Sequence, residues 1–273
     1  MSWLVCPANG GEVPIADSSH CGRNNYHMIL GDFGLNGEGN LSRNPHGLGI
    51  GRTEDVTHPS SGQARAIFGM KNVFGTFGAV SDGLSNTFAF SERLGLTTSR
   101  SGYDPSEPGR GYAGAGNAWA RNINPNADGS GGQYRIQCIT ASRVAHTIEM
   151  NSPGLQWTSG NPMLNGLTMI MPPNMASCTR VHDDATPPVA QGQWNGDHIH
   201  VNTPSSNHPG GVNVAIGDGS VQFISDTINS VSPEFTDGSV IIKSSNNAEY
   251  SSPSHWGIWG MMSTAHAGES ASL

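Results

Sequence analysis

Three histidines in the C-terminal half have the spacing of metal ligands. His198 and His200 stand two positions apart in the stretch Asp197-His198-Ile199-His200, and His208 follows soon after. Residues at i and i+2 of a strand project from the same face, so both imidazoles could hold one metal ion, with His208 as a third ligand. We therefore predict a site for zinc or another transition metal. The alternative is a chance pattern among eleven histidines, exposed in a polar loop.

A second candidate metal site is the stretch Asn124-Pro-Asn126-Ala-Asp128-Gly129. It has oxygen ligands at positions 1, 3 and 5 of a calcium-binding loop and the glycine at position 6. An EF-hand needs a bidentate carboxylate at position 12, where this chain has Arg135. The hypothesis is therefore an irregular calcium site, with an Asn/Gly turn as the alternative, and the cofactors considered are Zn or Ca.

The usual sequence patterns of nucleophilic and nucleotide chemistry are missing. The chain has no Gly-x-Ser-x-Gly elbow, no Walker loop and no G-x-G-x-x-G after a predicted strand. Ser220 lies in Gly-Asp-Gly-Ser-Val, which is typical of a hairpin turn. These observations weakly disfavour an enzyme.

The chain contains four cysteines, Cys6, Cys21, Cys138 and Cys178, and none forms a C-x-x-C pair. A zinc ribbon or a thioredoxin-type motif therefore fits poorly. Two disulfides in an oxidising compartment fit better, and four buried free thiols are the alternative.

Composition limits the fold and the partners. Charged residues are 12% of the 273 residues, and the formal net charge is −8, so the chain lacks the basic field that nucleic acid binding requires. Glycine and proline together number 37 + 17 = 54, which favours short strands joined by many turns. No run of 18 apolar residues occurs, and there is no visible repeat or linker. We predict a single domain over residues 1–273.

Two segments have strand patterns. Thr87–Glu92 nearly alternates apolar and polar residues. In Gly211–Ile224 an Asp218-Gly219 dipeptide separates two alternating runs, which predicts a hairpin with a type I′ turn. Opposite residues then have numbers that sum to 437, so Val214 would face Phe223 and Ile216 would face Val221.

The remaining local predictions concern a helix, a break and the tryptophans. Apolar spacing from Ile136 to about Met150 indicates a short helix, and Pro172-Pro173 must end whatever precedes it. Five tryptophans could stack on sugar rings, but packing in the core is favoured. They are Trp119, Trp157, Trp194, Trp256 and Trp259.

Several motifs, in order, resemble one family over nearly the whole chain. The segment from His208 to Asp218-Gly219, a histidine, nine residues and Asp-Gly, resembles the C-terminal signature of the planctomycete prepilin-like family that carries a domain of unknown function. The earlier residues of that pattern are Asp82, Gly83, Ser85, Asn86 and Glu92. Further matching segments are Cys6-Pro7, Asn25-Tyr26, Gly69 to Phe74, Cys138, Gly154 to Gly160, Pro172 to Cys178, Trp256 to Gly260 and Gly268-Glu269.

The resemblance implies a type IV pilin-like protein. In such proteins a long N-terminal hydrophobic helix packs on an antiparallel sheet, and the present sequence shows neither that helix nor a leader before Cys6. We therefore expect an α+β, β-rich fold: an antiparallel sheet with long Gly/Pro/Asn-rich loops, forming a pilin-like globular head without the N-terminal helix. Membrane contact would come only through that absent helix. The family blocks also imply disulfides Cys6–Cys21 and Cys138–Cys178.

Three functions follow from these observations. The first is an exported pseudopilin-like structural or interaction protein, extracellular or at the cell surface, with other pilin-like subunits or surface components as partners. The second is a carbohydrate-binding module for polysaccharide. The third is a metal-dependent extracellular hydrolase that uses His198, His200 and His208.

The two signature residues His208 and Asp218 are predicted to act separately. If residues 211–217 form a strand, the two lie about 25–30 Å apart at 3.3 Å per residue. Asp218 would cap its own turn, and His208 would face the neighbourhood of Asn229 or act with His198 and His200. The motif residues as a group have the types that turns prefer.

Overall fold

The computed structural model describes residues 24–32, 35–36, 66–68, 76–93, 118–121, 165–175, 178–181, 199–230, 254, 256–268 and 273, with backbone alone for 35–36, 118–121, 178–181 and 199–201. The strands are β1 (Tyr26–Ile29), β2 (Leu35–Asn36), β3 (Phe88–Glu92), β4 (Ala118–Arg121), β5 (Gly166–Leu167), β6 (Cys178–Val181), β7 (Ile199–Val201), β8 (Gly211–Ile216) and β9 (Val221–Ser225). Within these residues the helical segments are η4 (Phe77–Ala79), η5 (Leu84–Asn86) and α3 (Gly257–Met261). The described part of the chain is thus β-rich, as its composition predicts.

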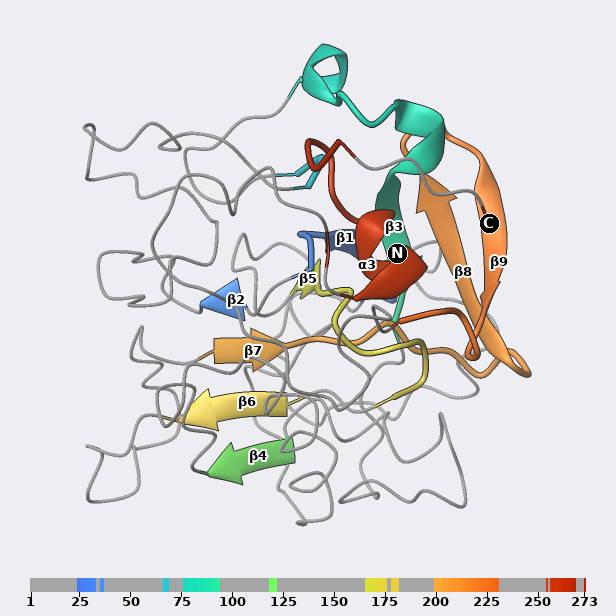
Figure 1. The fold of residues 1–273 in the computed structure, drawn as a ribbon. Helices are drawn as coiled ribbons and strands as arrows, with labels where there is room; N and C mark the ends of the chain where they lie inside the picture. The colour runs from blue at the N-terminus through green and yellow to red at the C-terminus, as the bar shows by residue number, and fades with distance from the viewer. Residues whose placement is uncertain are drawn as a thin grey trace, which may run out of the picture.

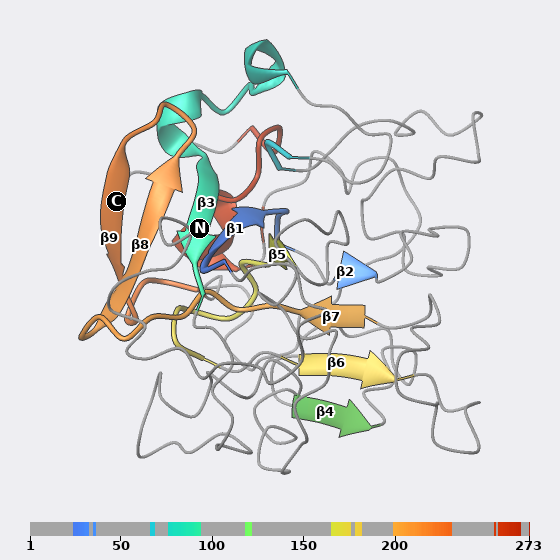
Figure 2. The same ribbon diagram turned by 180° about the vertical axis from the view of Figure 1, so that it is seen from behind.

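The strands form two sheets, and both are mixed (Figures 1 and 2). The larger sheet has the order β5-β1-β3-β8-β9, and the smaller has the order β2-β7-β6-β4. In the larger sheet the pairs β1–β3, β3–β8 and β8–β9 are antiparallel, as predicted, but β5 runs parallel to β1. In the smaller sheet β4 runs parallel to β6. The expectation of a purely antiparallel sheet is therefore wrong, because a strand remote in sequence can join an edge in either direction.

One face of the five-stranded sheet carries the core. Phe88 of β3 and three residues of β8 contribute to it, and α3 covers it (Figure 1), with Trp259 of the helix and Met262, its C-cap residue, in the core. The rings of Phe88 and Trp259 lie 5.4 Å apart at 60°, a tilted arrangement that aromatic pairs favour. The indole N–H of Trp259 donates to the Met171 carbonyl oxygen at 2.7 Å, so the buried ring keeps a hydrogen-bond partner. The full cluster is Ile29, Phe88, Leu167, Met169, Val212, Val214, Ile216, Ile224, Trp259 and Met262.

The strand predicted over Thr87–Glu92 is confirmed as β3, and the predicted hairpin is confirmed as β8 and β9. Its register differs by one residue. Val214 pairs with Gln222, and Phe223 pairs with Asn213, so the predicted pairs Val214–Phe223 and Ile216–Val221 are wrong. The N–H of Ile216 donates to the Ser220 carbonyl oxygen at 2.8 Å, which leaves a three-residue loop rather than a two-residue one, and the N–H of Gly219 donates to the Ile216 carbonyl oxygen at 3.0 Å within that loop.

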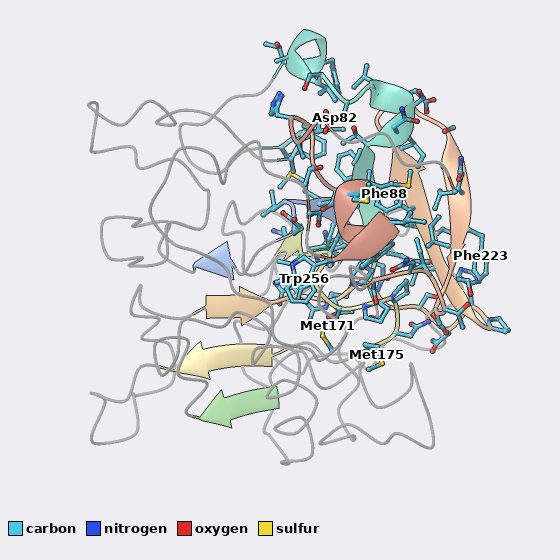
Figure 3. All side chains as sticks on the ribbon, in the orientation of Figure 1. Asp82, Phe88, Met171, Met175, Phe223 and Trp256 are labelled. Atoms are coloured by element: carbon cyan, nitrogen blue, oxygen red, sulfur yellow. The ribbon has the colours of Figure 1, made fainter. Side chains whose placement is uncertain are left out.

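The turn chemistry explains the different register. Gly219 has φ of +89°, whereas Asp218 is not among the described residues with positive φ, so a type I′ turn is excluded. A type I turn followed by a left-handed glycine accommodates the extra loop residue. A one-residue change moves every side chain of β9 to the other face. It places Ile224 in the core opposite Val212 and turns Phe223 outward (Figure 3).

The other face of the sheet carries several exposed apolar side chains beside Glu92 and Asn213. Residues directly opposite one another share a face, so the pairings place Tyr26, Phe90, Val221 and Phe223 together on it. Their exposed fractions are 42%, 39%, 64% and 52%. We call these four residues the outer apolar face.

Two further predictions concern segments that the structure does not describe. The helix expected from Ile136 to Met150 and the calcium segment 124–135 lie outside the described residues. Strand β5 already ends at Leu167, and Pro172-Pro173 lies in a turn in which the Met175 N–H donates to the Pro172 carbonyl oxygen at 3.3 Å.

Candidate functional site

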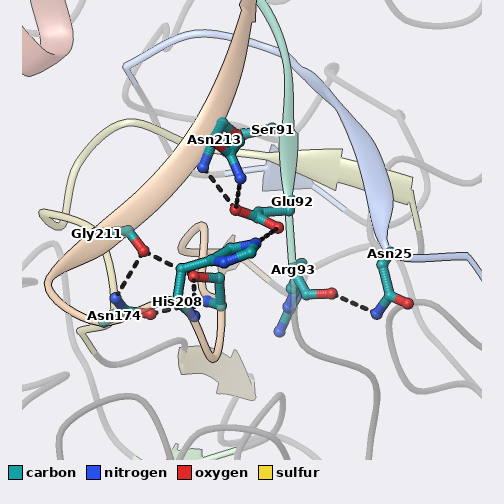
Figure 4. A network of polar contacts seen from close by, with 9 residues as sticks. Asn25, Ser91, Glu92, Arg93, Asn174, His208, Gly211 and Asn213 are labelled. Carbon is teal, nitrogen blue, oxygen red and sulfur yellow. Dashed lines mark hydrogen bonds and ion pairs between the residues drawn. The ribbon is translucent and has the colours of Figure 1, made fainter. Parts of the chain in front are cut away.

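The candidate site centres on Glu92, the last residue of β3 (Figure 4). Its carboxylate is buried, and its Oε1 accepts hydrogen bonds from the backbone N (2.6 Å) and the side-chain Nδ2 (3.0 Å) of Asn213 in β8. Regular pairing of β3 with β8 reaches Ser91 opposite Val214. The Glu92 carboxylate therefore continues the ladder by one step, because its oxygen accepts from the next backbone N–H of β8.

His208 is the partly exposed member of the site. Its Nε2 lies 3.4 Å from Glu92 Oε2, and 33% of its side chain is exposed. The backbone N of His208 donates to Ser206 Oγ at 3.0 Å, which orients the loop before β8. When His208 is protonated, the contact is an ion pair between a buried carboxylate and a surface imidazolium. The structure thus brings together two signature residues that are far apart in the sequence.

The side-chain amide of Asn174 makes three hydrogen bonds close to this pair. Its Oδ1 accepts from the Ser206 N at 2.8 Å, and its Nδ2 donates to Asp226 Oδ1 at 2.7 Å and to the Gly211 carbonyl oxygen at 3.4 Å. Asn174 has φ of +60°, a left-handed conformation that asparagine tolerates better than most residues. Burial raises the pKa of Asp226, and the hydrogen bond from Asn174 opposes that shift.

Sequence reasoning missed Asn174 and Asp226 as members of the site. The sequence signals for Asn174 are its place after Pro172-Pro173, where an asparagine marks a turn, and the family-like segment from Pro172 to Cys178. Asp226 follows β9 and carries no such signal. Its contact with Asn174 depends on the fold alone.

The motif around Asp82 holds the C-terminal segment. Asp82 Oδ2 accepts from the Ala267 N at 2.9 Å, and Oδ1 accepts from the Gly268 N at 3.0 Å. Asn86 Nδ2 donates to the Asp82 carbonyl oxygen at 3.2 Å, and Gly83 has φ of +91°. Ser85 is exposed in η5. Apart from Ser85, these motif residues form a turn that also binds a segment distant in sequence.

Asp218 and His208 lie at opposite ends of β8. Asp218 Oδ1 accepts from the N and the Oγ of Ser220 at 2.9 and 2.7 Å, and these bonds lower the pKa of the exposed Asp218 carboxyl. The predicted cap on its own turn is therefore present, and His208 contacts Glu92 instead of Asp218.

The predicted metal and disulfide residues are mostly outside the described part. His198, Cys6, Cys21 and Cys138 lie outside it, and for His200 in β7 and Cys178 in β6 only the backbone is described. Within the described ranges, no group of three or more His, Cys, Asp or Glu is placed to hold a metal ion. The site of His198, His200 and His208, and both disulfides, stay predictions.

Two of the five tryptophans considered for sugar stacking have described side chains, and both are buried. Trp256 Nε1 donates to the Asp32 carbonyl oxygen at 2.9 Å, and Trp259 lies in the core. Neither offers a face to a sugar. Only the backbone of Trp119, in β4, is described, and Trp157 and Trp194 lie outside the described residues.

A further titratable group, His27, lies on the core side of β1, opposite Ser91. It is completely buried. Burial, followed by the positive charge of Arg93, lowers its pKa from 6.5 to about 3, and a backbone contact with Asn24 opposes this. His27 is therefore a neutral imidazole at physiological pH.

Comparison with known proteins identifies a family. The model of a family described as "Protein of unknown function (DUF1559)" matches residues 1–230. No curated protein and no solved structure matches the chain. In the part of the chain that the structure describes, no helix has the length and hydropathy to cross a membrane.

Proposed function

This chain belongs to the DUF1559 family, a pilin-like domain of unknown function, and we propose that it is the globular head of an exported pilin-like protein with a structural or interaction role at the cell surface or in a secretion assembly. The pilin-like arrangement of the head, with a β-rich sheet under an N-terminal helix, is part of this proposal.

The observation that carries the proposal is the outer apolar face. Tyr26, Phe90, Val221 and Phe223 come from three strands of one sheet, and each is at least 39% exposed. Single exposed apolar residues are ordinary on protein surfaces, but several gathered on one sheet face are typical of an interaction site. Phe68 extends this surface, since its ring lies 4.8 Å from that of Phe90.

The polar motifs support the same conclusion. Glu92 and Asp82 use both carboxylate oxygens in contacts within the chain, to Asn213 and His208 and to the 267–268 backbone. Ser206 Oγ donates to the Gly211 carbonyl oxygen at 2.7 Å. Polar groups with such partners within the chain stabilise loops and hold the sheet in place. This structural role accounts for the presence of these residues in the motif.

Protease treatment of intact cells tests the exported location. An antibody against the chain should detect its loss when intact cells receive proteinase K, while a cytoplasmic marker survives. Survival of the chain on intact cells, together with its digestion after lysis, would contradict the proposal.

A further inference from the structure

Strand β9 forms one edge of the five-stranded sheet (Figures 1 and 2). The Ile216 N–H donates to the Ser220 carbonyl oxygen at 2.8 Å, and the Asp226 N–H donates to the Gly210 carbonyl oxygen at 2.9 Å. Because hydrogen-bonded pairs alternate in an antiparallel ladder, Gln222 and Ile224 direct their backbone groups to β8. Val221 and Phe223 therefore direct their backbone N–H and C=O groups away from the sheet.

Within the described residues, β9 lacks three of the devices that prevent pairing at a sheet edge. Proteins commonly protect an edge strand with lysine, proline or a bulge. Residues 211–230 contain no lysine, arginine or proline, and β9 pairs with β8 without interruption from Val221 to Ser225. The side chains of Val221 and Phe223 also belong to the outer apolar face, so a strand added here would meet an apolar surface.

The charges near β9 indicate which partner it would take. Asp218 precedes the strand and is exposed, and Asp226 follows it, partly exposed, with its Oδ1 accepting from Asn174 Nδ2. Among the described residues, the one arginine with a described side chain is Arg93, which is buried. The strand spans about 13 Å, at 3.3 Å per residue, so one carboxylate lies near each end of a five-residue run.

We infer that β9 accepts an extended segment of a partner protein as a sixth strand, and that this segment is apolar in its middle and basic at both ends. The inference rests on the proposed interaction role and specifies its partner. A second copy of this chain fits less well, because two antiparallel β9 strands would bring Asp218 of one copy toward Asp226 of the other.

The test uses the purified full chain and two synthetic peptides. The first is Lys-Lys-Val-Thr-Val-Thr-Val-Lys-Lys, and the second has glutamate in place of each lysine. The basic peptide should bind about tenfold more tightly at low salt, as two ion pairs at the protein surface allow. Its addition should slow hydrogen exchange of the Val221 and Phe223 amides, which strand addition would bury in hydrogen bonds.

Two variants at one position separate the backbone from the side chain. Val221→Pro removes an outward N–H at the first residue of an edge strand, where proline is tolerated. It should weaken binding about fivefold, the value of one hydrogen bond. Val221→Thr keeps the N–H and the shape and should change binding less than about twofold. Thermal melting checks that both variants fold.

Three results would overturn the inference. They are unchanged exchange of both amides with saturating peptide, equal binding of the two peptides, and a concentration-dependent dimer that Val221→Pro abolishes. The measurements do not depend on where the protein resides, so their failure leaves the protease result on intact cells to decide the exported location.

Discussion

His27 makes the stability of this protein depend on pH in a way that one substitution should remove. The imidazole is 1% exposed on the core side of β1, and its pKa falls from 6.5 to about 3 in the folded chain. Burial is the main cause, and the charge of Arg93 adds to it. Protonation of His27 would place a second positive charge in an environment that solvates it poorly.

The sign and the size follow from linkage. Between pH 6.5 and about 3 the unfolded chain binds a proton at His27 and the folded chain does not. Stability therefore rises with pH in this window, and the contribution present above pH 6.5 is lost as the pH falls toward 3. At about 1.4 kcal/mol per pKa unit, the full loss is about 5 kcal/mol.

Urea unfolding of the wild type and of His27→Leu at pH 7.5, 6, 5 and 4 measures this contribution. The difference between the two proteins cancels the other ionisable groups, including Asp226, whose raised pKa acts in the opposite direction. At pH 7.5 the variant should unfold within about 1 kcal/mol of the wild type, because leucine removes buried nitrogens and keeps an apolar side chain. Between pH 7.5 and pH 4 the unfolding free energy of the variant should rise by about 3 kcal/mol relative to that of the wild type.

Parallel curves of unfolding free energy against pH for the two proteins would refute this reasoning. They would mean that His27 has the same pKa in the folded and unfolded chains. An NMR titration gives an independent check, since the ring resonances of His27 should not shift between pH 7.5 and 4.5.

The remaining predictions concern the polar motifs and the turn. Gly219→Val should cost about 1–3 kcal/mol because its φ of +89° strains a β-branched residue, whereas Gly219→Asn should cost less; equal melting temperatures for both would contradict this. Asp82→Ala should cost about 1–3 kcal/mol and speed proteolysis of the segment 265–268, which loses two hydrogen bonds; an unchanged cleavage rate would show that the clamp is unimportant. Glu92→Gln should cost about 1 kcal/mol in urea unfolding because an acceptor oxygen remains, and Glu92→Ala about 3 kcal/mol because the Asn213 N–H loses its partner; equal losses would refute a role for the acceptor.

Local features of this protein could be predicted from its sequence. The strand at Phe88–Glu92 follows from alternation within six residues, and the β8–β9 hairpin follows from an Asp-Gly dipeptide between two apolar runs. Asp218 caps its own turn through Ser220, two residues away. Each of these depends on backbone angles and hydrogen bonds between near neighbours, which short stretches of sequence specify.

The register of the hairpin shows where local information was insufficient. Both a two-residue and a three-residue loop are open to Gly-Asp-Gly, and they differ by one residue in pairing. The tertiary structure selects the second, because it buries Ile224 against the core and leaves Val221 and Phe223 outside. Which side of β9 faces the core depends on α3, more than thirty residues further along the chain.

The candidate site was likewise decided by the tertiary structure. The motif residues Glu92 and His208 are visible in the sequence, but their contact exists because β3 and β8 are neighbours in the sheet. Asn174 and Asp226 join them through a turn and a strand end that no short pattern connects. Sequence patterns report the conformation of a few consecutive residues, whereas neighbouring strands are chosen by the burial of apolar side chains across the whole sheet. The pairing of β3 with β8 therefore places the Glu92 carboxylate beside the His208 imidazole.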